Sequence, residues 1–142
     1  MEPLDVVNRW NEAWNTGDSD AVAAMYADDV VYQHAMLPEP ITGREAVRQF
    51  ISGMGSAFSD IDDAVVHTVH SGNEVAVEIR HRARHTGDLP TPMGPVPATD
   101  RTVELVAAHF FRVNAAGLIV EERMYANPMA MMAQLGVMPT SS

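Results

Sequence analysis

Four histidines and one glutamate are the residues of this sequence whose type and spacing could carry proton-transfer chemistry. His34, His81, His85 and His109 each share an alternating, strand-like face with apolar residues, and Glu122 does the same on a later segment. Because an unperturbed histidine has a pKa of about 6.5, one that faces a pocket can act as a general acid or base. For any one of these histidines the competing interpretation is a hydrogen-bonded structural role.

Other chemistries find little support in the sequence. The chain has no cysteine, which excludes disulfides and thiolate ligands. His81 and His85 are four residues apart, which is about 13 Å along a strand and too far to bind one ion. His67 and His70 point to opposite faces of their strand. No glycine-rich phosphate loop or nucleophile elbow is present. We therefore expect no metal site and no cofactor.

The composition indicates one compact domain. A chain of 142 residues with 46% hydrophobic composition can build one complete core, which we place in residues 1–138, with residues 139–142 as a tail. The net charge of -10 argues against nucleic acid and anionic membranes as partners. No apolar segment approaches the roughly 20 residues of a membrane span, and the N-terminus has no signal-peptide pattern. A cytoplasmic location is the resulting expectation.

The first half of the chain has the periodicity of helices. Apolar residues recur every three or four positions over 4–15, and again over the short segment 21–26. Residues 30–34 alternate as a strand. The sequence of 42–45, Thr-Gly-Arg-Glu, fits a capping box, and a helical stripe follows over 47–54.

The second half alternates with period two. Residues 65–70 and 74–85 form a predicted hairpin, and 102–113 and 118–127 form two further antiparallel strands. Pro128 opens a final methionine-rich helix that Gly136 can end. Helices followed by an antiparallel meander predict the α+β class. The excursion over 89–100 could either close a pocket or contact a second copy.

Several segments, in order, resemble the SnoaL-like polyketide cyclase family. They include Trp10–Asp18, Tyr26–Tyr32, Gly43–Val47, Ala57–Asp60, His85–Gly87, Pro97–Arg101 and Gln134–Gly136. The resemblance covers nearly the whole chain and implies the nuclear-transport-factor-2-like, or ketosteroid-isomerase-like, superfamily. It implies a fold of three N-terminal helices packed on a curved antiparallel sheet, forming a cone with a deep apolar pocket. It also implies a homodimer.

The same resemblance implies where acid–base residues belong, and this sequence departs from it. The aspartate that serves the cyclases as acid/base matches Met124, which cannot transfer a proton. A family histidine matches His109. In the related ketosteroid isomerases, the general-base aspartate falls on His34, the oxyanion-hole aspartate on His109 and a helix tyrosine on Trp10.

These observations lead to a functional hypothesis. The chain is expected to be a cofactor-independent cyclase or isomerase for a small, apolar, carbonyl-bearing metabolite of polyketide or terpenoid kind. His34 would be the base, His109 would donate a hydrogen bond to the enolate oxygen, and Glu122 would be a reserve acid/base. The expected pocket residues are Trp10, Trp14, Tyr32, Phe50, Met54, Phe58, His81, His85, Phe111 and Met124. The alternatives are a non-catalytic binding protein and, with less support, an epoxide hydrolase.

Overall fold

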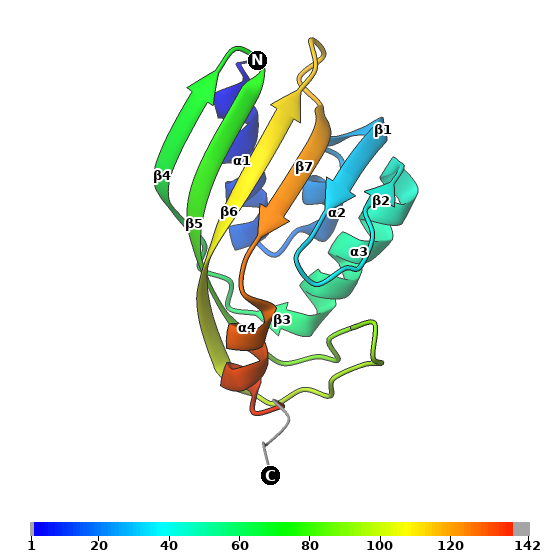
Figure 1. Ribbon diagram of the computed structural model, residues 1–142, viewed down its shortest axis with the longest axis vertical. Helices are drawn as coiled ribbons and strands as arrows, with labels where there is room; N and C mark the ends of the chain where they lie inside the picture. Colours follow the sequence, from blue (N-terminus) through cyan, green and yellow to red (C-terminus); the bar gives the residue numbers. More distant parts are fainter. Residues whose placement is uncertain (1, 138–142) are drawn as a thin grey trace.

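A computed structural model describes residues 2–137 (Figure 1). Its helices are α1 (Pro3–Asn15), α2 (Ser19–Ala23), α3 (Arg44–Ala57) and α4 (Pro128–Leu135). Its strands are β1 (Tyr26–Gln33), β2 (Ile41–Thr42), β3 (Phe58–Ser59), β4 (Ala64–Ser71), β5 (Glu74–His85), β6 (Thr102–Val113) and β7 (Ile119–Tyr125). The predicted tail, residues 139–142, lies outside the described residues.

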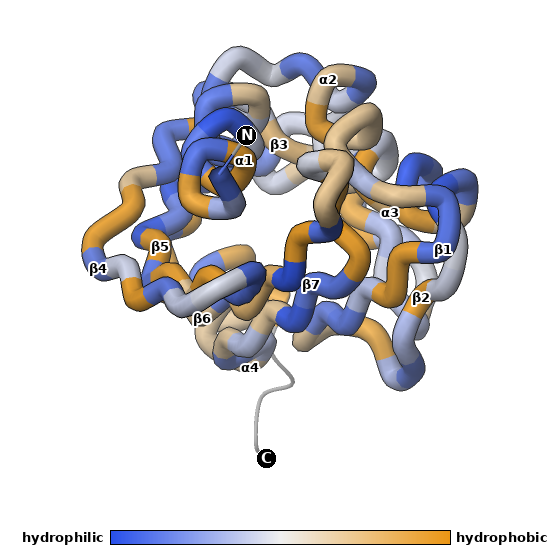
Figure 2. Tube along the Cα trace, turned by 90° about the horizontal axis from the view of Figure 1, so that it is seen from above, coloured by the Kyte–Doolittle hydropathy of each residue, from blue (hydrophilic) through white to orange (hydrophobic). Residues whose placement is uncertain are grey.

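One curved sheet forms the frame of the molecule. Its strand order is β2-β1-β7-β6-β5-β3, and β4 pairs with β5. Viewed from above, β4 to β7 form an arc, and α1 and α2 lie across from it (Figure 2). The predicted α+β class, with N-terminal helices on a curved antiparallel sheet, is confirmed. One pairing differs from the rest, because β1 runs parallel to β7.

Helix α1 forms where the apolar periodicity predicts it. Val6, Val7 and Trp10 are buried on the face that packs against the sheet. Gly17 follows the helix with a φ of 73°, a backbone conformation that glycine adopts without steric cost. The Asp18 carboxylate then accepts a hydrogen bond from the backbone N–H of Ala21 and caps α2. The helix pair therefore places Trp10 against the concave side of the sheet.

The predicted capping box of α3 is wrong. Thr42 belongs to β2, where it pairs with Val31, and so its hydroxyl does not cap the helix. Gly43 takes the N-cap position with a φ of 92°. Glu45 pairs with Arg48 within the first turns instead of reaching back. Pairing of the short strand β2 with β1 therefore holds Thr42 in an extended conformation and prevents the capping box from forming.

Strand β7 departs in part from its predicted alternation. Glu122 and Met124 point inward as predicted, with exposed fractions of 0% and 8%. Strict alternation from Glu122 predicts that Leu118 and Val120 also point inward, but the structure buries Ile119 instead. The register between β6 and β7 shifts next to Val113, and the bulge moves the start of β7 onto the other face.

A second apolar cluster closes the lower end of the sheet. It consists of the buried residues Ala57, Leu89, Val103, Met131 and Leu135. Leu89 brings the excursion over 89–100 into this cluster through a bridge with Val96. Helix α4 begins at Pro128 and Gly136 terminates it as the C-cap, as predicted, while the Asn127 side chain caps its start. Among the described residues, no helix has the length and apolarity needed to cross a membrane.

Candidate active site

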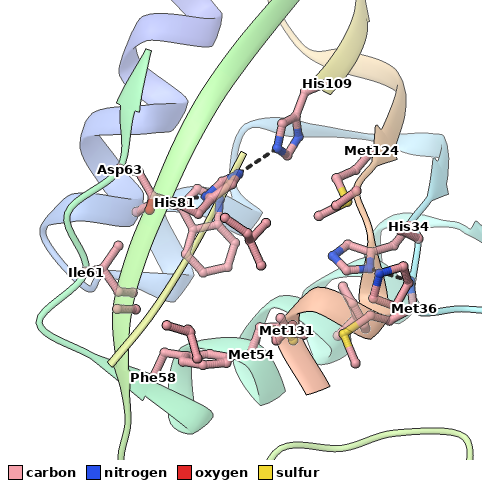
Figure 3. Close-up of a pocket in the computed structure, with 18 of the residues that line it drawn as sticks. His34, Met36, Met54, Phe58, Ile61, Asp63, His81, His109, Met124 and Met131 are labelled. Atoms are coloured by element: carbon pink, nitrogen blue, oxygen red, sulfur yellow. Dashed lines mark hydrogen bonds and ion pairs between the residues drawn. The ribbon is translucent and has the colours of Figure 1, made fainter. Parts of the chain in front are cut away.

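A cavity of about 130 Å³ lies between the helices and the concave side of the sheet. Its wall is mostly aromatic and aliphatic, and its histidines and its carboxylate come from the residue after β1, from β5, from β6 and from the segment before β4 (Figure 3). The predicted pocket residues that line it are Trp10, Trp14, Tyr32, His34, Phe50, Met54, Phe58, His81, His109 and Met124. The tertiary fold thus brings together residues from both halves of the chain.

Three predicted site residues are not among those that line the cavity. His85 is fully buried beside Phe58, and its Nδ1 lies 2.9 Å from the Thr99 hydroxyl. Phe111 packs behind the wall, stacked on the His109 ring. Glu122 is completely buried behind His109. These side chains support the wall without forming its surface.

His34 directly follows β1 and is surrounded by aromatic rings. Its ring stacks on Tyr32 and meets the edge of Phe50. Its Nδ1 accepts a hydrogen bond of 3.1 Å from the backbone N–H of Met36. Burial, with a smaller contribution from His109 and His81, lowers the pKa of His34 to about 3. His34 is therefore neutral near pH 7, with its proton on Nε2, because Nδ1 is used as an acceptor.

On another wall, an aspartate and two histidines form a hydrogen-bonded row. The Asp63 carboxylate lies 3.0 Å from His81 Nδ1, and His81 Nε2 lies 2.9 Å from His109 Nε2 (Figure 3). The backbone of Asp63 is held in turn by the side chains of Asn11 and Asn15. Both nitrogens of His81 are thus occupied, while Asp63 lines the cavity.

The row continues into the core through Glu122. His109 Nδ1 lies 3.0 Å from Glu122 Oε2, and the Tyr26 hydroxyl donates to Glu122 Oε1 at 2.5 Å. The indole N–H of Trp10 donates to the Tyr26 oxygen at 2.9 Å. Burial raises the pKa of Glu122 to about 8 and lowers the pKa of His109 well below its usual value. Near pH 7, Glu122 is therefore protonated and His109 is neutral.

Sequence reasoning missed two members of this row. The pair Asp62–Asp63 stands before a predicted strand, a pattern typical of solvated turn residues, although only 8% of Asp63 is exposed. Tyr26 was assigned to the end of a short helix, whereas it begins β1 and its hydroxyl is buried. The local sequence offers no signal for either, because their partners Asn11, Trp10 and Glu122 are distant in the chain. Within residues 2–137, no group of three or more acidic or histidine side chains is placed to hold a metal ion.

Comparison with solved structures supports the same architecture. IdmH from Streptomyces antibioticus, a proposed polyketide cyclase, has a TM-score of 0.75 and 28% identity over 96% of this chain and 100% of its own. AclR from Streptomyces galilaeus, a proposed hydroxylase, has a TM-score of 0.80 and 22% identity over 96% of this chain and 97% of its own. A ketosteroid isomerase-like protein from Catenulispora acidiphila, solved with trimethylamine, has a TM-score of 0.76 and 19% identity over 97% of this chain and 96% of its own.

A family match agrees with these structures and with the site. Residues 7–122 match the SnoaL-like domain family, which covers most of the chain and includes every polar residue of the row from Trp10 to Glu122. The matched segment also contains His34 and the aromatic residues of α1 and β1 that face the cavity. The chain therefore belongs to the SnoaL-like domain family.

Proposed function

We propose that this protein is a cofactor-independent enzyme of the cyclase or isomerase type, acting on a small apolar metabolite that carries a carbonyl group. The observation that carries the proposal is the placement of polar groups in an otherwise apolar cavity. His34 and Asp63 come from different walls, with the methionines and aromatic rings between them (Figure 3). A carbonyl compound held between them would meet a hydrogen-bond donor and a carboxylate.

The hydrogen bonds favour a different division of roles from the one predicted by the sequence. His34 was expected to be the base, but its Nδ1 is used by Met36 and its low pKa makes it a weak base. His109 was expected to donate to the substrate, but both its nitrogens are engaged by His81 and Glu122. In our proposal Asp63 is the base, and the Nε2–H of His34 is the donor.

The proposed reaction begins with proton transfer from the carbon next to the carbonyl. Asp63 takes this proton, the C–H electron pair forms a carbon–carbon double bond, and the carbonyl π pair moves onto the oxygen. The resulting enolate oxygen accepts a hydrogen bond from His34. The enolate carbon then either attacks a second carbonyl within the same molecule, whose oxygen takes the proton back from Asp63, or, where a conjugated double bond extends the enolate, Asp63 returns the proton to a more distant carbon. The first outcome is a cyclisation and the second is an isomerisation. The polyketide cyclase description of IdmH supports the first.

The proposal can be tested before the substrate is known. Small cyclic ketones and β-diketones are incubated with the protein in deuterated water, and deuterium uptake next to the carbonyl is followed by mass spectrometry. We expect protein-dependent uptake that Asp63→Asn reduces at least 100-fold. The matched control is Asp62→Asn, since Asp62 is the exposed neighbour and pairs with Arg80 at 3.5 Å. Equal uptake in Asp63→Asn and the unmodified protein would reject the assignment.

A non-catalytic binding protein is the second candidate. The specific observation in its favour is that the nitrogens of His81 and His109 are satisfied within the protein, which leaves few polar groups for a ligand. Such a protein would bind the same ketones without any deuterium uptake. Calorimetric binding together with unchanged ligand after prolonged incubation would support this candidate over the enzyme.

A further inference from the structure

Six side chains form one continuous hydrogen-bonded chain from the core to the cavity. In order they are Trp10, Tyr26, Glu122, His109, His81 and Asp63. They come from α1, β1, β7, β6, β5 and the segment before β4. Of the six, Trp10, His109, His81 and Asp63 line the cavity, while Tyr26 and Glu122 are fully buried behind it. The chain therefore connects a carboxyl group in the core with a carboxyl group at the cavity.

Proton counting limits the states that this chain can adopt. Three hydrogen bonds link Glu122 to Asp63 through the two histidines, and each needs one proton. This requirement is strongest for the hydrogen bond between the two imidazole rings, because without a proton two nitrogen lone pairs would face each other at 2.9 Å and repel. Three protons shared among two carboxyl groups and two imidazoles leave one negative charge for the set.

That charge can rest on either carboxyl group. In one form, Glu122 holds a proton and donates it to His109 Nδ1, His109 Nε2–H donates to His81, and His81 Nδ1–H donates to the Asp63 carboxylate. In the other form, each of the three protons has moved across its own hydrogen bond. Glu122 is then the carboxylate and Asp63 the carboxylic acid. No proton enters or leaves the set in this exchange.

We propose that Glu122 is a positioning residue that determines, through the His109 and His81 pair, whether Asp63 presents a carboxylate or a carboxylic acid to the cavity. The exposed fraction of Glu122 is 0% and that of Asp63 is 8%, so burial disfavours the charge on Glu122. The form with the charge on Asp63 is therefore favoured, and its carboxylate can accept a proton. The alternative form provides an acid for returning one.

Trp10 fixes the direction of the hydrogen bond between Tyr26 and position 122, so the residue at position 122 must be able to accept it. Its indole N–H can only donate, so it occupies the Tyr26 oxygen as an acceptor and directs the Tyr26 proton toward Glu122. A glutamine at position 122 would accept from Tyr26 through its carbonyl and donate to His109 through its amide. Glu122→Gln therefore preserves all hydrogen bonds but holds the chain in the form with an Asp63 carboxylate.

The titratable side chains near Glu122 lie on three strands of the sheet. They are Tyr26 and Tyr32 from β1, His109 from β6 and, one step further, His81 from β5. Burial raises the pKa of both tyrosines above its usual value, so neither ionises before Glu122. Since burial raises the pKa of Glu122 to about 8, its loss of a proton falls within an accessible pH range.

The experiment measures the histidine tautomers directly by nitrogen-15 NMR, with the two rings assigned by His81→Gln and His109→Gln. Near pH 7 we expect the unmodified protein to hold His109 with its proton on Nε2 and His81 with its proton on Nδ1. Above pH 8, Glu122 releases its proton to solvent, and the set then holds two protons for three hydrogen bonds. The Glu122 carboxylate should take a hydrogen bond from His109 Nδ1–H, and one of the other two bonds should be lost. In Glu122→Gln both tautomers should match those of the unmodified protein at pH 7 and stay unchanged to pH 10.

Glu121→Gln is the matched control, because Glu121 directly precedes Glu122 on β7 but pairs with Arg112 and Arg123 on the opposite face. It should follow the unmodified protein throughout. A His109 proton on Nδ1 at pH 7 in the unmodified protein would overturn the proposal, as would a pH-dependent tautomer change in Glu122→Gln. If Glu122→Gln does not fold, the position of the His109 proton at pH 7 in the unmodified protein still tests the proposal.

The inference rests on the proposed function only for the role of Asp63, and the two can fail separately. The tautomers are read without any substrate. The expected tautomers without deuterium uptake in any ketone would leave the proton chain standing and reject the enzyme. Deuterium uptake together with the opposite tautomers would support the enzyme and reject the proton chain. If both hold, deuterium uptake should change above pH 8 in the unmodified protein and not in Glu122→Gln.

Discussion

The Nε2 atoms of His81 and His109 lie 2.9 Å apart, so one proton is shared between the two rings. Their centroids are 5.1 Å apart and the rings are tilted by 54°. Each ring also bonds a carboxyl group through its other nitrogen. The pair therefore joins Asp63 to Glu122, and every polar atom in it has a partner.

Removal of one ring should be costly. In His81→Phe, the His109 Nε2–H loses its acceptor and the Asp63 carboxylate loses its donor. An unsatisfied buried polar group costs about 1–3 kcal/mol, and we expect a loss of this size in the free energy of unfolding measured with urea. His67→Phe, on the exposed face of β4, is the control and should change stability by less than about 0.5 kcal/mol. Equal effects in the two variants would contradict the proposed coupling.

Substitution of His34 should reduce the reaction rate more than ligand binding. The Nε2–H of His34 stabilises negative charge that develops only on the enolate oxygen, and loss of such a donor typically costs about 100- to 1000-fold in rate. We expect His34→Phe to lower kcat by this factor with little change in KM. His34→Gln, which keeps an N–H donor, should recover part of the rate. A His34→Phe variant with unchanged kcat would remove His34 from the mechanism.

Acid should destabilise the fold through His34. Its pKa is about 3 in the folded chain, below the ordinary value of 6.5 that it regains on unfolding. Between these two pH values the unfolded chain binds more protons, so stability falls as the pH is lowered from 6.5 to 3. The free energy of unfolding falls by at most roughly 1.4 kcal/mol per pH unit in this range, the value for uptake of one proton. Urea unfolding at several pH values should show a shallower acid slope in His34→Gln than in the unmodified protein.

Glu122 should have the opposite effect on pH dependence. Its folded pKa of about 8 lies above the ordinary value of 4.5, so the folded chain binds more protons between these values and stability falls as the pH rises through them. We expect the free energy of unfolding of Glu122→Gln, relative to the unmodified protein, to increase steadily from pH 4.5 to pH 8. A constant difference across this range would show that Glu122 does not retain its proton.

We expect the outer face of the sheet to bind a second copy of the chain. Val106, Phe110 and Tyr125 expose 54%, 39% and 46% of their surface on the side of the sheet away from the cavity. Exposed apolar side chains gathered on one face are typical of interaction sites, and the family resemblance implies a homodimer. Light scattering should give a dimer mass for the unmodified protein and a monomer mass for Phe110→Lys. Met93→Lys, at an almost fully exposed loop position, should remain dimeric.

Much of the fold and part of the site could be predicted from the sequence. Period-two alternation correctly directed His34, His109 and Glu122 inward, because neighbouring apolar side chains can be buried only on one face of a strand. Helical periodicity likewise placed Trp10 against the sheet. Local turn chemistry predicted the ends of α4, since proline and glycine have narrow backbone preferences that depend little on the rest of the chain.

Only the tertiary structure decided which of these groups bond to one another. His109 pairs with Val77, four residues before His81, a separation of about 13 Å along a flat strand. The curvature of the sheet turns both side chains toward the same point, and pairing of β6 with β7 sets Glu122 behind them. The partners of Asp63 and Tyr26 are also far away in the chain. The sequence by itself therefore determined that His34, His109 and Glu122 face inward. The three-dimensional packing buried Asp63 and Tyr26 beside them and decided the hydrogen-bond partners of these groups, and with them which atoms hold the protons.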